Sequence, residues 1–333
     1  MSAIQGVVSE ESADRKMPPV RGVLVEGPVV DAKFLDSYIA FGMMIAGSIG
    51  ALVWAFTQGI GWVEISVFVG TFALSTVGIG FMHRYFVHRS FRCGPVMRTL
   101  LAAIATMAVQ GSVLKWVSNH RRHHLHSDKP GDVHSPHYDG AGNRHVSFVK
   151  GMLHAQGGWV LDPVATDAEY YAKDILADPI AMFFTRTRWY WFAMSAVLIP
   201  GAIGYALGGV HAMIGCVLFS GLFRSYVMTM ATSLVNSVCH SDGRYGYRRF
   251  ELNDGTTNEL VTTILTFGEG LHNNHHRFPR DAYLSHAWYE IDINGLIIRG
   301  LGKLGLVHDI FAAAPLPGSD GGKRSIPDPE ALV

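Results

Sequence analysis

The sequence predicts an all-α integral membrane protein with four transmembrane helices in two hairpins and a cytoplasmic helical domain. One observation is composition: of 333 residues, 49% are hydrophobic and only 16% are charged, against roughly 25% charged in soluble domains. Another is the length of the uncharged stretches, which cover residues 37–63, 65–82 and 189–223. A spanning helix needs about 20 apolar residues, so each stretch is long enough or nearly so. A third is a set of clustered histidines that such a domain would hold together.

We expect the four spans at about 38–57, 63–82, 189–207 and 211–237. The uncharged run 189–223 is too long for one helix, and Gly208-Gly209 offers a turn between two. The loops 58–62 and 208–210 contain no lysine or arginine, so nearly all basic residues fall on the opposite side. By the positive-inside rule that side is cytoplasmic, which places both termini and the histidines there.

The remaining segments complete the predicted organisation. Residues 1–34 and 311–333 are rich in polar residues, Gly and Pro and are expected to be flexible tails around a domain spanning 35–310. Residues 99–114 are uncharged but too short to cross, which favours an interfacial or re-entrant helix. The amphipathic stretch 291–306 is expected to lie on the same membrane surface as that helix. The three cysteines form no C-x-x-C pair, and the zero net charge gives no indication of nucleic-acid binding.

Eight histidines fall into three clusters: His83 and His88; His120, His123 and His124; His272, His275 and His276. Imidazole is a common ligand of first-row metals. Within each triplet the spacing i, i+3, i+4 puts the side chains on one helix face, where they could present three imidazoles to one small volume. A straight helix would splay the first pair by about 140°. Either the chain bends near the first pair or its members serve different metals, and both options favour two ions.

The fourth predicted span supplies two further candidates. Residues 211–240 would form a helix of about 45 Å, against a hydrocarbon core of about 30 Å. Its last turns therefore project into the cytoplasm and carry Asn236 and His240 on one face. His240 becomes a ninth candidate ligand, and Asn236 a ligand directly or through water. Arg224 would lie near the bilayer midplane, either as a functional charge or buried against polar helix groups.

Together these pieces resemble the membrane fatty-acid desaturases, specifically the stearoyl-CoA Δ9 type in a bacterial-like form without fused cytochrome b5. The matching stretches are HRYFVH at 83–88, NHRRHH at 119–124, NSVCH at 236–240 and GEGLHNNHHRFP at 268–279. Three features outside these stretches also match: Trp116, HAQGGW at 154–159 and WYEID at 288–292.

The resemblance implies a pair of iron ions on the cytoplasmic side of a four-helix transmembrane cone. The implied ligands are His83, His88, His120, His123, His124, His240, His272, His275 and His276, with Asn236 through water. The implied reaction uses O2 and two electrons to remove two hydrogens from unactivated methylenes of a long-chain acyl substrate in the membrane. Its products are a cis double bond and two waters. Substrate contacts are expected at Trp116, Asn119, His154, Trp159 and Ser233.

Departures from the family pattern leave the substrate's carrier open. Where animal acyl-CoA enzymes contact CoA, this chain has Ser118-Asn119 and Asp162-Pro163, so coenzyme A, a glycerolipid and an acyl-carrier protein are all retained. Ser233 stands where a tunnel tryptophan is expected, which weakens any inference about chain length or double-bond position. No haem-binding H-P-G-G is present, so we expect electrons from a separate ferredoxin, or from cytochrome b5 with its reductase.

Two other functions compete with desaturation. A hydroxylase or alkane monooxygenase of the same histidine-box superfamily would use similar ligands. A membrane zinc hydrolase or metal-binding receptor belongs to a different class, but zinc sites rarely need nine imidazoles.

Overall fold

The computed structural model describes residues 20–313, so residues 1–19 and 314–333 of the predicted tails lie outside the described part. The α-helices are α1 (Pro28–Thr57), α2 (Trp62–Phe81), α3 (Pro95–Met107), α4 (Val113–His126), α5 (Phe148–Gln156), α6 (Ala168–Tyr171), α7 (Lys173–Leu176), α8 (Pro179–Arg186), α9 (Arg188–Ala193), α10 (Ile199–Gly215), α11 (Arg224–Ser237), α12 (Leu260–Leu265), α13 (His272–Arg277) and α14 (Ile293–Lys303). The π- and 3₁₀-segments are η1 (Met82–Val87), η2 (Gly158–Leu161), η3 (Met194–Leu198), η4 (Cys216–Phe223) and η5 (Val238–His240). Two short antiparallel pairs join β1 (Val23–Leu24) to β3 (Ala165–Thr166) and β2 (Arg92–Cys93) to β4 (Val307–His308).

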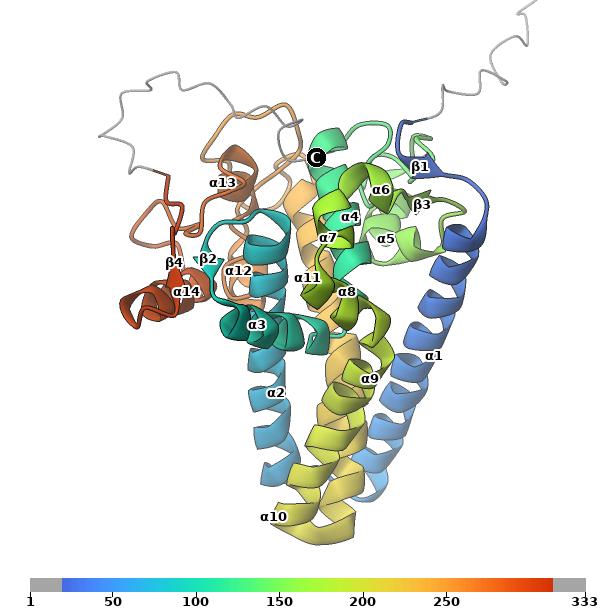
Figure 1. Cartoon of the computed structure of the whole chain (residues 1–333). Helices are drawn as coiled ribbons and strands as arrows, with labels where there is room; N and C mark the ends of the chain where they lie inside the picture. The colour runs from blue at the N-terminus through green and yellow to red at the C-terminus, as the bar shows by residue number, and fades with distance from the viewer. Residues whose placement is uncertain (1–19, 314–333) are drawn as a thin grey trace, which may run out of the picture.

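Three helical segments are long and apolar enough to cross a membrane: Pro28–Thr57, Trp62–Val87 and Arg188–His240. They run side by side in the lower part of the molecule, below a cap of short helices (Figure 1). Their outward faces carry exposed apolar side chains, such as Phe56 at 89% exposure. In a water-soluble protein that surface would be costly, whereas hydrocarbon accepts it.

The third segment, of 53 residues, reverses direction at the predicted turn. Gly208 and Gly209 have non-helical backbone angles, and Gly209 has φ +69°, a left-handed value that glycine adopts without strain. The two arms then pack closely, because a Cβ on Gly204 would lie 2.5 Å from the carbonyl oxygen of Ala212. The small residues at this contact let the two backbones approach.

The first long helix begins earlier in the chain than the sequence predicted. Helix α1 starts at Pro28, ten residues before the expected span, because proline suits the first helical turn and Asp31 favours the helix N-terminus. Just before it, Val23 and Leu24 pair with Thr166 and Ala165. Residues 20–34, which we expected to belong to a flexible tail, are therefore partly ordered by backbone pairing with the cap.

The short uncharged segment at 99–114 is divided between two helices rather than forming one. Helix α3 lies across the bundle beside α2 (Figure 1), and a Cβ on Gly78 of α2 would meet the Ile104 carbonyl of α3. The chain then turns through Val109 and Gly111, both with positive φ. Helix α4 begins after Ser112, whose side chain accepts a hydrogen bond from the Lys115 amide. This turn aims the second histidine cluster into the cap.

A buried apolar cluster holds the histidine-bearing segments together. It joins Phe81 of α2, Phe86 of η1, Leu101 of α3, Val113 of α4 and Ile298 of α14. Helix α14 falls within the amphipathic stretch expected at 291–306. The packing fixes η1 and the adjoining His88 against α4, and this part of the chain carries five of the clustered histidines.

Arg224 is fully buried among the long helices. Its guanidinium donates to the Ser75 hydroxyl at 2.9 Å and to the hydroxyl and carbonyl oxygens of Ser195 at 2.9 and 3.0 Å. Of the two roles considered for this residue, the contacts support burial against polar helix groups.

Candidate metal centre

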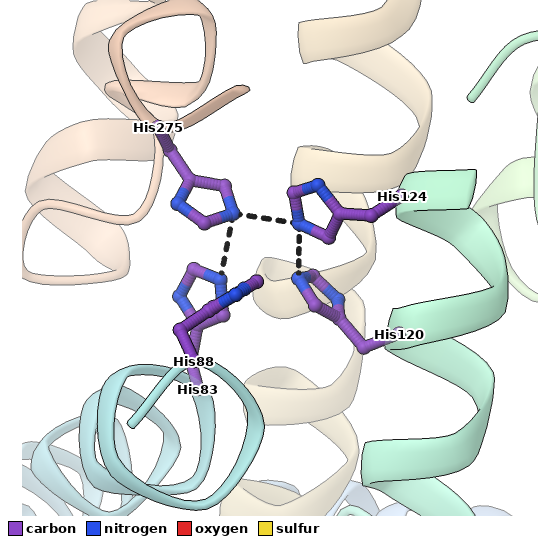
Figure 2. A group of neighbouring side chains, drawn as sticks. All are labelled: His83, His88, His120, His124 and His275. Carbon is purple, nitrogen blue, oxygen red and sulfur yellow. Dashed lines mark hydrogen bonds between the residues drawn. The ribbon is translucent and has the colours of Figure 1, made fainter. Parts of the chain in front are cut away.

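The nine predicted histidines converge in the cap as two adjacent groups. In each group the ligand nitrogens all lie within 4.8 Å of one another, a spacing at which one metal ion can be held. The first group contains His83, His88, His120, His124 and His275 (Figure 2). The second group contains His123, His240, His272 and His276.

A π-helical turn explains how His83 and His88 reach the same group. The segment η1 continues α2 with the wider i to i+5 pattern, and the His88 amide donates to the His83 carbonyl at 3.2 Å. In this wider turn residues five apart come close to one face, and the two ring centroids lie 4.9 Å apart. The bend that we considered for this pair is therefore a π-turn, a feature often found at functional sites.

Each H-x-x-H-H cluster is divided between the two groups, so neither presents all three imidazoles to one volume as we expected. In α4, His120 and His124 face the first group and His123 the second. In α13 the assignment is reversed, with His272 and His276 in the second group and His275 in the first. Residues i and i+4 differ by about 40° around a helix, whereas i+3 lies about 60° and 100° from them. The helical angles thus divide both clusters in the same way.

The distances between imidazole nitrogens match a shared first-row ion. In the first group, His275 Nε2 lies 3.0 Å from His83 Nε2 and 2.8 Å from His124 Nε2, which is 3.0 Å from His120 Nε2 (Figure 2). Two nitrogens bound to one ion at about 2.1 Å and at roughly 90–110° would be about 3.0–3.4 Å apart. The site therefore has the right size for metal coordination.

Carboxylates hold the opposite nitrogen of four of these imidazoles. Glu269 contacts Nδ1 of His83 at 2.5 Å, Asp132 that of His123 at 2.9 Å, Asp128 that of His240 at 2.7 Å and Asp254 that of His276 at 2.9 Å. Metal-binding histidines commonly donate their second N–H to a carboxylate, which fixes the ring and leaves the other nitrogen as a ligand.

The carboxylate pairs give a direct argument for a cation in the second group. Because Nδ1 of His123 donates to Asp132 and Nδ1 of His276 donates to Asp254, a neutral ring keeps only a lone pair on each Nε2. These two Nε2 atoms face one another at 3.3 Å. Two lone pairs at that distance repel, and a metal ion between them would turn the repulsion into coordination.

The electrostatics favour the neutral form of most of these imidazoles. His240 is different, because although burial acts to lower its pKa, Asp128 raises it to about 9. Burial, together with the neighbouring histidines, lowers the pKa of His120, His124, His272 and His275 well below 6.5. Burial also lowers the pKa of His276 to about 4, although Asp254 opposes this shift. Neutral imidazole is the form that binds metals.

Two buried arginines anchor the segments that carry the ligands. Arg84, between the first two histidines, donates to Glu269 at 3.0 Å and to Asp292 at 2.8 Å. Although burial raises the pKa of Glu269, Arg84 and His83 together lower it to about 2, so Glu269 is ionised. Arg121 donates to Asp174 and to the carbonyl oxygen of Val87, which ties α4 to η1.

Sequence reasoning found some of these outer residues and missed others. Asp128, Glu269 and Asp281 are the few carboxylates close to the clusters in the sequence, and the first two contact histidines of the centre. Asp281 instead lies 3.5 Å from His286. Asp132 and Asp254 were missed, since they lie in loops whose path the sequence does not reveal. The only available signal was the position of Asp132, shortly after the second cluster.

An open cavity adjoins the centre. Of the residues expected to contact substrate or water, Trp116, Asn119, Trp159, Ser233 and Asn236 line it, together with His120. Met44, Val109 and Phe192 lie at its apolar part, inside one buried cluster of the long helices. The cavity thus connects the first histidine group with an apolar interior.

His154 is the exception among the expected substrate residues, because it is absent from the lining of this cavity. Its Nε2 lies 2.9 Å from Asp162 and its Nδ1 lies 3.1 Å from the Ser135 carbonyl oxygen. These contacts connect α5 to two loops. His134, by contrast, lines the cavity, and its ring centroid lies 4.5 Å from that of His123.

Comparison with known proteins identifies the family of this arrangement. Residues 38–299 match the family model described as fatty acid desaturase. The hex-5-enoyl-[acyl-carrier protein] acetylenase of Moorena producens (strain JHB) is 35% identical over 268 residues, 79% of this chain and 82% of that protein. The sn-1 stearoyl-lipid 9-desaturase of Anabaena variabilis is 32% identical over 270 residues, 80% of this chain and 90% of that protein. The icosanoyl-CoA 5-desaturase of Limnanthes douglasii is 31% identical over 252 residues, 74% of this chain and 64% of that protein.

Proposed function

This chain belongs to the fatty acid desaturase family, and on that premise we propose that it desaturates a saturated long-chain acyl substrate with O2 at a di-iron centre. The observation that carries the proposal is the pair of adjacent histidine groups beside a cavity with an apolar interior. A C–H bond of an unactivated methylene has no accessible pKa, so acid–base groups alone cannot remove its hydrogen. Two iron ions would supply the oxidising power that the side chains lack.

We assign one iron to each histidine group. The first would be held by His83, His88, His120, His124 and His275. The second would be held by His123, His240, His272 and His276, with Asn236 acting through water. This assignment is supported by the short nitrogen–nitrogen distances within each group and by the carboxylates behind four of the rings.

The remaining groups of the chain would position the substrate and control access of water. Trp116 and Trp159 give the cavity flat apolar walls beside His120. Asn119 and Ser233 offer polar contacts along the same wall. The buried carboxylates hold the protons on Nδ1 of their histidines, so the imidazoles keep the same nitrogen directed toward the reacting region.

The chain's placement in a membrane follows from the same proposal. We assign four spans to α1, to α2 with η1, and to the two arms of Arg188–His240, arranged as two hairpins. The histidine centre and both termini would lie on the cytoplasmic side, as the distribution of basic residues indicates. An acyl substrate dissolved in the lipid would then reach the cavity from the bilayer.

The finer specificity is a cis double bond at Δ9 of an acyl-CoA, made with electrons from a separate ferredoxin or from cytochrome b5 with its reductase. An acyl-lipid substrate is the second candidate, favoured by the name of the Anabaena relative, a stearoyl-lipid 9-desaturase. The three relatives are named for three different acyl carriers, so family membership alone does not choose among them.

Expression in a host that lacks its own desaturase, followed by mass spectrometry of total fatty acids, tests this function. New monounsaturated chains support desaturation, and a single position nine carbons from the carboxyl end supports the finer proposal. Hydroxy acids without new alkenes would favour the hydroxylase, and no new product would contradict the proposal. Purified protein is expected to hold close to two irons, whereas a lone zinc would overturn the assignment of the centre.

A further inference from the structure

A half-buried lysine lies where two cavities meet. Lys115 lines the cavity that reaches the first histidine group, and it also lines a second cavity beside the start of α1. Five residues line both cavities and form the boundary between them: Asp36, Ser112, Lys115, Asn119 and Trp159. A ligand extending from one cavity into the other would pass this ammonium group.

The charge of Lys115 has no close counter-ion among residues 20–313. The carboxylate that acts on it is Asp36, but Arg188 already holds that carboxylate through two contacts, at 3.0 and 2.8 Å. Within the described part of the chain, the ammonium makes no hydrogen bond or ion pair with another side chain or backbone group. An ammonium has three donors, and no described residue of the chain accepts from those of Lys115. They are therefore available to a ligand that fills the cavities and can accept hydrogen bonds.

The second cavity carries two further cations that are satisfied by neutral groups. Lys33 donates to the carbonyl oxygens of Trp159, Asp162 and Val164, at 3.2, 2.8 and 2.8 Å. Arg122, which lines the same cavity, donates to the carbonyl oxygens of Gly131 and Gly140 and to the Thr166 hydroxyl. Their positive charges are therefore not cancelled by these contacts. Two carboxylates also line this cavity, but Asp36 is held by Arg188, and Asp162 by His154 and the Gly140 amide. The cations thus remain available to an anionic occupant.

We propose that Lys115 binds the carboxyl end of the acyl substrate, donating to the ester or thioester carbonyl oxygen where the two cavities meet. This inference rests on the proposed function. The acyl chain would then extend past His120 and Asn236, and the anionic part of its carrier would occupy the second cavity. Because the carbonyl is fixed at one point, the same carbons always face the metal centre. Lys115 would thereby determine the position of the double bond.

The test compares Lys115→Met and Lys115→Arg with the wild type in the desaturase-deficient host. Mass spectrometry of derivatised fatty acids gives the amount and position of each double bond. We expect Lys115→Met to lower the product about tenfold, because a hydrogen bond to a charged group is lost, and to spread the double bond over several positions. Lys115→Arg keeps a charged donor and should retain a single position.

A matched control is Lys150→Met, since Lys150 is exposed on α5; it should behave as the wild type. Iron content and melting temperature of each purified variant separate loss of folding from loss of substrate binding. If the methionine variant does not fold, Lys115→Leu, which also lacks a donor, carries the same test. Wild-type yield at a single position in a folded Met or Leu variant would overturn the role of Lys115. Absence of any alkene from the wild-type protein would instead contradict the proposed function.

Discussion

The carboxylate behind His123 gives the sharpest test of the two-site assignment. Asp132 is fully buried and accepts from His123 Nδ1 at 2.9 Å, from the Asp128 amide at 2.9 Å and from the His134 amide at 3.2 Å. The substitution Asp132→Asn keeps the shape of the side chain but removes the negative charge that holds the His123 ring. Outer carboxylates of this kind typically contribute 10- to 100-fold to metal affinity, or about 1.4–2.8 kcal/mol.

The expected loss of metal affinity affects only one of the two ions. His123 belongs to the four-histidine group, while the five-histidine group has its own carboxylate, Glu269. Titration with an iron chelator, followed by metal analysis, should therefore show one iron released from Asp132→Asn at about 10- to 100-fold lower chelator concentration. The other iron should remain as in the wild type. The control Asp309→Asn removes an exposed carboxylate and should change neither release. If both irons of Asp132→Asn leave together or neither leaves early, the independent assignment of the two sites is wrong.

Three further predictions follow from contacts around the centre. His124→Ala should lose the iron of the five-histidine group and His276→Ala that of the other group, both with loss of desaturation; full activity in either variant would contradict the ligand assignment. Although burial raises the pKa of Asp174, Arg121 and Arg89 lower it to about 2. The ionised carboxylate therefore stabilises the folded protein above about pH 4, and this contribution is lost as the pH falls toward 2. Asp174→Asn should cost about 1.5–3 kcal/mol at pH 7, a difference that should disappear in thermal unfolding at acid pH. Gly78→Ala would place a Cβ 2.4 Å from the Ile104 carbonyl and should destabilise the protein by about 1–3 kcal/mol, whereas Gly70→Ala, with open space around it, should have little effect.

Much of the architecture could be predicted because it depends on patterns that are local in the sequence. Uncharged runs located the membrane-length helices, and Gly208-Gly209 marked the reversal within the third. The first helix began earlier than expected, since its charged first turns packed against the cap rather than ending at the apolar run. The division of 99–114 into α3 and α4 was also missed, because positive φ at Val109 is not encoded by a typical turn residue.

The sequence shows which histidines cluster, but it does not show how they divide between the two groups of the centre. Spacing alone placed each triplet on one face, whereas the structure assigns the middle histidine of each triplet to the other group. The sequence also left open how His83 and His88 could meet, because a π-turn has no reliable sequence signal. The loop carboxylates Asp132 and Asp254 escaped detection for a different reason. Their role depends on where long loops return in space, which no local pattern specifies.

The reciprocal division of the two triplets has a consequence for how the centre forms. Without α13, the first group keeps four histidines but the second keeps only His123 and His240. Without α4, the first group falls to three and the second also to three. Neither group is therefore complete until α4 and α13 have packed together, the first group also with His83 and His88 at η1 and the second with His240 of η5. Since ligand nitrogens from separate segments must converge before an ion is fully held, metal binding would stabilise the assembled cap. Contacts that need no metal join the same segments, since Arg84 of η1 binds Glu269 and Asp292, and Arg121 of α4 binds the Val87 carbonyl oxygen.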